Sequence, residues 1–145
     1  MSQELSKARL KLWVRLLGVT RSTESTLREF LRLNYQTTLP RFDVMAALYR
    51  RREGTTMTEL SRMLLVSNGN ATTVVDRLEK DGLTKRTPSA TDRRTVHVAL
   101  TPEGVAAFEK QAVDIEAEVN KVFGDLSAEE LDTLTAIFKR IGGKK

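Results

Sequence analysis

The feature of the sequence that most constrains the fold is an apolar repeat that runs through the first 34 residues. Apolar side chains recur at steps of three and four positions from Leu5 to Val19, and Leu27 and Leu31 continue the pattern. This spacing predicts one amphipathic helix over residues 3–34. Globular helices usually span about 8–20 residues, so one small core cannot cover a helix of this length. We therefore expect part of it to pack against another chain.

The rest of the sequence predicts five shorter helices and one β-hairpin. Thr56 with Glu59, and Ser127 with Glu130, fit the capping box that opens a helix, and Pro102 suits a first helical position. The predicted helices cover residues 39–51, 57–64, 68–80, 102–123 and 128–141, and the predicted strands cover residues 83–87 and 95–101. This order, α-α-α-α-β-β-α-α, predicts a fold that is mainly α with a small β-hairpin.

The two short helices at residues 57–64 and 68–80 are typical of a helix-turn-helix. In that motif the second helix lies in the major groove of DNA and reads bases from its N-terminal half. Short polar side chains, which let a helix approach closely, gather on the solvent side of residues 68–80, and a solvated helix in a small α-domain is the alternative. The candidate DNA contacts in this region are Ser67, Asn68, Asn70, Thr72, Thr73 and Arg77.

The hairpin that follows carries a basic tip. Lys85, Arg86, Arg93 and Arg94 exceed the single acid Asp92 by three charges. A hairpin that projects from a helix-turn-helix is called a wing, and an arginine at its tip can enter a narrow minor groove. These five residues are therefore the candidate DNA contacts of the wing.

Two consecutive stretches, "TELSRMLLVSNGNATTVVDRLEKDGL" and "TKRTPSATDRRTVHVALTPEG", together with the helix order, resemble the MarR family of bacterial winged-helix transcription regulators. The resemblance covers nearly the whole chain, and its most specific part is D-R-R followed by a strand and "LTPEG". It implies a homodimer in which residues 1–36 and 102–145 form a helical dimerisation domain. Residues 37–101 would then form the winged helix-turn-helix DNA-binding domain.

The resemblance also implies roles for residues at the wing tip. Arg94 would be the minor-groove arginine, and Asp92 would orient its guanidinium through a fork-to-carboxylate pair. Arg93 would serve a phosphate. The alternative for Asp92 is a plain Asx-turn residue, and the two roles are compatible.

The implied partners are double-stranded DNA with a pseudo-palindromic operator, a second copy of the chain, and a small effector that releases a repressor. The family's effectors are usually anionic aromatic compounds, held where the dimerisation helices meet the DNA-binding lobe. "LLVSNGNATTVVDRL" resembles a branch that governs catabolism of aromatic acids and senses their coenzyme A thioesters, while a simple phenolic acid or another effector stays open. The candidate effector-binding residues are Trp13, which also suits an interface or core, Arg15, Tyr35 and Arg41.

Composition supports a polyanionic partner and disfavours catalysis. The net charge is +5, with the positive excess in residues 1–101, and the chain has no cysteine. The single histidine, His97, has no partners spaced for a metal or catalytic site, and no glycine-rich phosphate loop occurs, so we expect no cofactor, no metal and no enzyme activity. No signal peptide or apolar membrane span is expected, which predicts a cytoplasmic protein. A winged-helix module that binds another protein remains the alternative, although the basic wing tip favours DNA.

Overall fold

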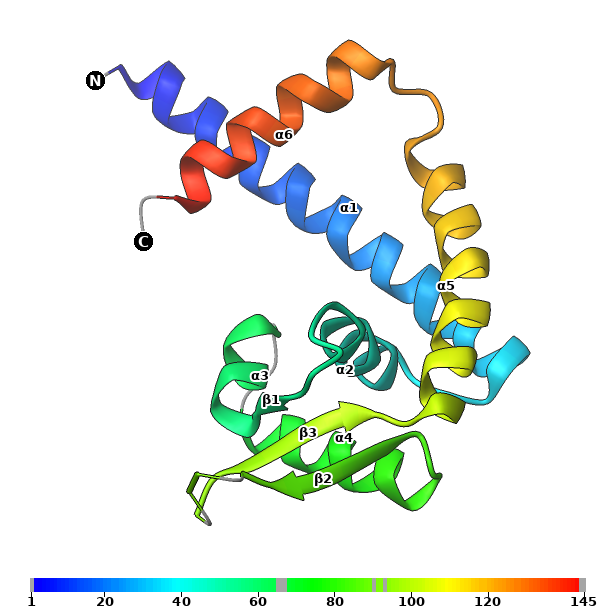
Figure 1. Cartoon of the computed structure of the whole chain (residues 1–145). Coiled ribbons are helices and arrows are strands. Elements are labelled where there is room, and N and C mark those ends of the chain that lie inside the picture. Colours follow the sequence, from blue (N-terminus) through cyan, green and yellow to red (C-terminus); the bar gives the residue numbers. More distant parts are fainter. Residues whose placement is uncertain (1, 65–67, 90, 93, 144–145) are drawn as a thin grey trace.

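The computed structural model describes residues 2–64, 68–89, 91–92 and 94–143. The six predicted helices are confirmed, with ends that lie within one residue of those predicted (Figure 1). The elements are α1 (Gln3–Tyr35), α2 (Leu39–Arg50), β1 (Thr55–Thr56), α3 (Met57–Met63), α4 (Asn68–Lys80), β2 (Thr84–Pro88), β3 (Val96–Leu100), α5 (Pro102–Phe123) and α6 (Ala128–Gly142).

Local side-chain chemistry sets where the helices begin. The Oγ of Ser127 accepts a hydrogen bond from the Glu130 amide at 3.1 Å, and Glu130 Oε1 accepts one from the Ser127 amide at 2.9 Å. This is the reciprocal capping box predicted from the sequence. At α3 the Thr56 Oγ1 accepts from the Glu59 amide at 3.1 Å and donates to the Glu59 carboxylate at 3.0 Å. The predicted pair of Thr56 and Glu59 therefore caps the start of α3.

The sheet has three antiparallel strands in the order β1-β3-β2, where the sequence predicts only the β2–β3 hairpin. The added strand β1 is two residues long, and Thr55 and Thr56 pair with Val98 and His97 of β3. A two-residue strand is too short to show an alternating pattern, so its sequence carries no strand signal. Its pairing protects one edge of β3 and joins the wing to the start of α3.

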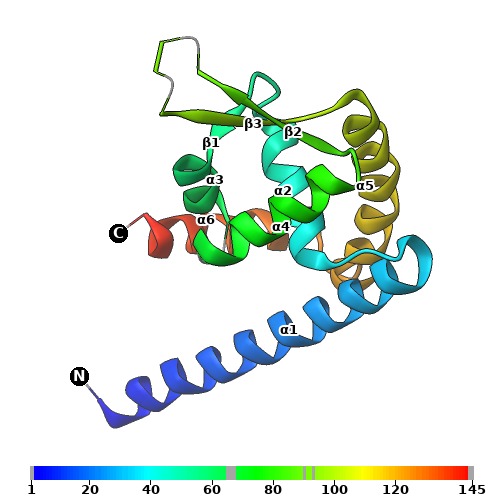
Figure 2. The same cartoon turned by 90° about the horizontal axis from the view of Figure 1, so that it is seen from below.

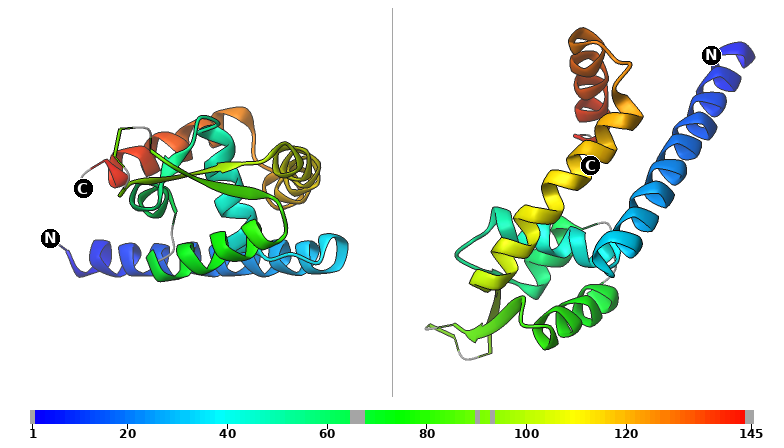
Figure 3. Two further views of the ribbon diagram at one scale, coloured as in Figure 1. Left: turned by 60° about the horizontal axis from the view of Figure 1, so that its bottom comes forward. Right: turned by 90° about the vertical axis from the view of Figure 1, so that its right-hand side faces the viewer.

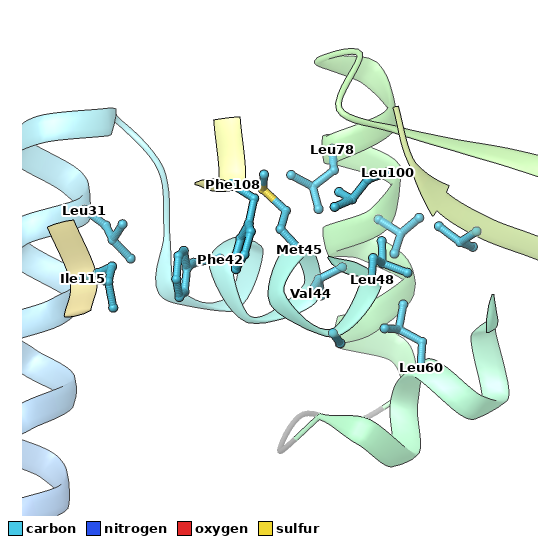
Figure 4. Packing of buried hydrophobic residues seen from close by; sticks show 13 residues of the cluster. Leu31, Phe42, Val44, Met45, Leu48, Leu60, Leu78, Leu100, Phe108 and Ile115 are labelled. Carbon is cyan, nitrogen blue, oxygen red and sulfur yellow. The ribbon is translucent and has the colours of Figure 1, made fainter. Parts of the chain in front are cut away.

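The hydrophobic core surrounds α2. Val44, Met45, Ala47 and Leu48 are almost completely buried, and residues from the end of α1 and from α3, α4, β3 and α5 pack around them (Figure 4). Leu31 on α1 ends this core on one side. The core therefore lies in the winged-helix part of the chain and leaves most of α1 outside it.

The "LTPEG" segment locks the base of the wing to α5. The Thr101 amide donates to the Leu83 carbonyl at 3.0 Å, and the Thr101 hydroxyl donates to the Gly82 carbonyl at 2.7 Å. The same hydroxyl accepts from the Gly104 amide at 3.0 Å, which caps α5. A Cβ on Gly104 would lie 2.0 Å from the Leu83 carbonyl oxygen, so only glycine allows this approach.

Replacing Gly104 by alanine is expected to lower the free energy of unfolding by about 1–3 kcal/mol, because the added methyl must displace the Leu83 backbone. The matched control is Gly18→Ala on α1, where nothing lies within 4 Å of the added Cβ. That change should leave stability unchanged or raise it by up to about 1 kcal/mol through helix propensity. Denaturant unfolding at one protein concentration measures both, and equal midpoints for the two variants would contradict the steric argument.

Two long segments of the chain expose apolar side chains away from the core. The N-terminal part of α1 and the whole of α6 extend beyond the winged-helix part, and α6 has no buried residue (Figures 1 and 3). We call this the outer apolar surface, and it consists of Leu5, Leu10, Leu12, Trp13, Val14, Leu16, Val19, Leu131, Leu134, Phe138 and Ile141.

Candidate nucleic-acid interface

The helix predicted to read DNA has one buried face and one exposed polar face. Ala71, Val75 and Leu78 of α4 are at most 1% exposed and anchor the helix on the core. The predicted contacts Asn70, Thr72, Thr73 and Arg77 are all exposed. Ser67 lies outside the described residues, and Asn68 begins the helix. The structure therefore presents four of the six predicted residues at the surface of one helix.

Arg77 is exposed but has a partner within its own helix turn. Its Nε lies 3.3 Å from Asp81 Oδ2, and more than two fifths of each side chain is exposed to solvent. An exposed pair of this kind contributes little to stability, since water screens it. Arg77 can therefore exchange Asp81 for a phosphate or a base at small cost.

The wing lies on the same side of the molecule as α4, as the view from below shows (Figure 2). Strands β2 and β3 pair from Thr84–Leu100 to Pro88–Val96, and the Ser89 amide donates to the Thr95 carbonyl at 2.8 Å. Lys85 is exposed on β2. The wing and α4 thus face the same side of the molecule.

Asp92 shapes the tip of the wing through the backbone of its neighbours. Its Oδ1 accepts from the Arg94 amide at 3.0 Å, and its Oδ2 accepts from the Thr95 hydroxyl at 3.0 Å. These are the bonds of an Asx turn. Among the described residues, the structure shows no ion pair between Asp92 and the exposed Arg94 side chain, and Arg93 lies outside the described residues. Asp92 therefore orders the loop from which Arg94 projects.

Arg86 differs from the other basic wing residues, since its guanidinium faces α4. It forms an ion pair with Asp76 at 2.5 Å and another with Glu79. The hydrogen bond to Asp76 is the main cause that raises the pKa of Arg86 above its ordinary value. The sequence prediction grouped Arg86 with the DNA contacts, but the structure places it in an ion-pair network with α4.

A cavity of about 510 Å³ opens between α1, α2 and α4. Arg28, Arg32, Arg41 and Arg77 line it, together with threonines of α4 and of the link from α1 to α2. Arg28 pairs with Glu24 at 3.4 Å and Arg32 with Glu29 at 2.6 Å, while the structure shows no ion pair for Arg41 within the described chain. The cavity has the cationic lining that an anionic ligand requires.

Of the four predicted effector residues, only Arg41 lines this cavity. Trp13 belongs to the outer apolar surface, and Arg15 is exposed on the same half of α1. Tyr35 is half-buried at the end of α1, where its hydroxyl donates to Asp114 of α5 and lies 3.4 Å from the Lys110 carbonyl oxygen. The hydrogen bond to Asp114 raises the pKa of Tyr35. The four residues are thus not brought together within one chain.

Sequence reasoning missed a second tyrosine that links the lobe to α5. The Tyr49 hydroxyl donates to Glu109 Oε2 at 2.7 Å, and this hydrogen bond raises the pKa of Tyr49. The Arg52 guanidinium lies 5.1 Å from the centre of the same ring. Tyr49 and its acceptor are 60 residues apart in sequence, so no local pattern could join them.

The described residues contain no cluster of histidine, cysteine or acidic side chains that could hold a metal ion. Within the same part of the chain, no helix is long and apolar enough to span a membrane.

Comparison with known proteins agrees with this geometry. Residues 37–96 match the model of the MarR family. The HTH-type transcriptional regulator MhqR of Bacillus subtilis is 28% identical over 138 residues, which cover 95% of this chain and 94% of that protein. An HTH-type transcriptional regulator of Bacillus cereus is 30% identical over 119 residues, covering 82% of this chain and 78% of the relative.

A solved structure of a mutant MarR from E. coli, complexed with operator DNA, has the same fold. It is 26% identical, covers 97% of this chain and 99% of its own, and superposes with a TM-score of 0.77. The helix-turn-helix, the basic wing, the family match and these relatives all indicate the same family. The chain belongs to the MarR family of winged-helix transcriptional regulators.

Proposed function

We propose that this chain is a sequence-specific repressor that binds a pseudo-palindromic operator as a homodimer and is released by a small anionic effector. The observation that carries the proposal is that α4 and the wing lie on one side of the molecule (Figure 2), with Asn70, Thr73 and Arg77 exposed on α4 and Arg94 exposed at the wing tip. Such a surface supplies base-reading groups for the major groove and a cation for the minor groove.

The outer apolar surface supports a second copy of the chain as the partner. The eleven large apolar side chains of this surface lie exposed on α1 and α6, and α6 packs no residue into the core. Exposed large apolar side chains in this number are uncommon on a monomer and typical of an interface between chains. In a twofold dimer, two α4 helices held about 34–36 Å apart can enter successive major grooves.

The cavity between α1, α2 and α4 supports effector control. Its arginines suit a carboxylate or phosphate, and its apolar wall suits an aromatic ring, so aromatic acids and their coenzyme A thioesters are the candidate effectors. An effector that prefers a wrong spacing of the two α4 helices shifts the population away from the DNA-competent state. A coupling of about 1–3 kcal/mol would weaken operator binding roughly 5–150-fold.

The test is binding of the purified protein to DNA upstream of its own gene, compared with random DNA over a salt series. We expect the upstream DNA to bind at least about 1,000-fold more tightly, with an affinity that falls steeply as salt rises. Aromatic acids and their coenzyme A thioesters are then added to the complex, with Arg41→Ala as the variant expected to resist release. Equal and weak binding to both DNAs would contradict the proposal and favour a winged-helix module that binds another protein.

A further inference from the structure

Lys85 and Arg86 are neighbours on β2 but face opposite sides of the sheet. Side chains alternate along a strand, so Arg86 shares its face with the buried Thr84, while Lys85 is exposed. Arg86 also pairs across the sheet with Val98, which is completely buried. The face that carries Arg86 is therefore turned toward the body of the lobe, where α4 lies.

The Arg86 guanidinium bridges two carboxylates that lie one helical turn apart on α4. Its Nη2 lies 2.5 Å from Asp76 Oδ1, and its Nη1 donates to Glu79 Oε2. Only 30% of the Arg86 side chain is exposed, so it has little surface left for another partner. The planar fork of a guanidinium can hold two acceptors in fixed directions, which the single ammonium of lysine cannot do. The contact therefore fixes β2 relative to α4.

The same contact balances charge on the helix predicted to approach DNA. Asp76 is 60% exposed beside the polar face of α4, and Glu79 follows one turn later. Without a cation between them, both carboxylates would repel the phosphates of an approaching duplex. Arg77 forms its ion pair with Asp81 instead. Arg86 is thus the cation that neutralises this side of α4.

We propose that Arg86 is a positioning residue, which holds the wing against the recognition helix and neutralises Asp76 and Glu79 without contacting DNA itself. The inference rests on the proposed DNA-binding function. Its consequence concerns specificity, because α4 and the wing must keep one relative orientation to occupy neighbouring grooves of the operator. Random DNA, which is held mainly through phosphates, places no such demand on the orientation.

The test compares three variants with a matched control. Arg86→Gln removes the cation, Asp76→Asn with Glu79→Gln removes both acceptors, and the triple variant removes the whole network. Lys110→Gln is the control, since it removes one exposed charge from α5, at a residue outside the predicted DNA contacts. Affinities for operator and random DNA are measured over a salt series, and thermal unfolding of each variant checks the fold. If Arg86→Gln fails to fold, Arg86→Lys, which keeps the charge but not the fork, replaces it.

We expect the ratio of operator to random affinity to fall about tenfold both when the cation is removed and when the acceptors are removed. In the triple variant the ratio should fall no further than in Arg86→Gln or in the double variant. The salt dependence of DNA binding by the triple variant should match that of the native chain. The control should keep the ratio. A direct phosphate contact would behave differently: Arg86→Gln would weaken both DNAs equally and reduce the slope of log affinity against log salt by about 0.9 per subunit, and that result would overturn the proposal.

A measurement without DNA separates this inference from the proposed function. Amide hydrogen exchange in residues 84–88 and 96–100 should be faster in Arg86→Gln than in Lys110→Gln, because the wing loses its anchor on α4. Equal exchange in the two variants would also refute the anchoring role. If the native chain fails to prefer operator DNA, the proposed function is wrong, and the exchange comparison still decides whether Arg86 anchors the wing.

Discussion

Replacing Phe138 by aspartate is expected to separate the proposed dimer and to weaken operator binding by at least about 100-fold, since each half would then bind alone. The Phe138 side chain is 48% exposed on α6, within the outer apolar surface. Burying a side chain of this size contributes about 1.5–3 kcal/mol, and a twofold interface uses it twice. A carboxylate in its place would need a partner that the surrounding leucines do not offer.

Sedimentation and operator titration measure the two effects on one sample. The control is Ala136→Asp, which introduces the same charge on α6 at an exposed position on the opposite side of the helix. That variant should remain dimeric and bind the operator normally. A dimeric Phe138→Asp protein with native affinity would show that the outer apolar surface is not the dimer interface. Circular dichroism confirms that each variant keeps its helices.

Replacing Arg94 by alanine is expected to cost about 1–3 kcal/mol of specific binding for each wing, the usual contribution of a base-directed contact. The Arg94 side chain is exposed and its backbone amide is held by Asp92, so the tip should keep its shape when the side chain is removed. Thermal stability should therefore stay unchanged. The loss should fall on operator DNA, where a narrow minor groove concentrates negative potential.

Titration against the native operator and against an operator with G·C pairs in place of A·T pairs at the wing positions tests the groove assignment. The native chain should bind the second DNA less tightly, because G·C pairs widen the minor groove and place an amino group in it. Arg94→Ala should bind both alike. Lys139→Ala, which removes an exposed cation from α6, is the control and should behave as the native chain does. Native affinity of Arg94→Ala for both DNAs would refute a minor-groove role.

The helices could be predicted because their signals are local. The Ser127 and Glu130 pair opens α6 through bonds between residues three apart, and Gly82 adopts φ +80° where the sequence predicts the end of α4. The solvent face of α4 also follows from spacing alone, which is why Asn70, Thr73 and Arg77 are exposed as predicted. Short-range patterns of this kind can be interpreted correctly without knowledge of the fold.

The features that sequence could not supply depend on residues far apart in the chain. Tyr35 bonds Asp114 across 79 positions, and Tyr49 bonds Glu109 across 60, so neither pairing has a local pattern. Alternation along β2 does predict that Arg86 and Lys85 face opposite sides of the sheet. The two carboxylates that Arg86 contacts on α4 could be identified only from the tertiary structure.

The hydrogen bonds of Thr101 connect the base of the wing directly to the first turn of α5. The hydroxyl and amide of Thr101 bond the two residues just before β2, and Gly104 lets the first turn of α5 rest on the Leu83 carbonyl. The 22 residues of α5 span about 33 Å at 1.5 Å per residue. A tilt of about 5° at the far end of that helix would therefore displace the base of the wing by roughly 3 Å, about the length of one hydrogen bond. In the proposed repressor, small movements where α5 meets its neighbours would therefore shift Arg94 relative to the DNA.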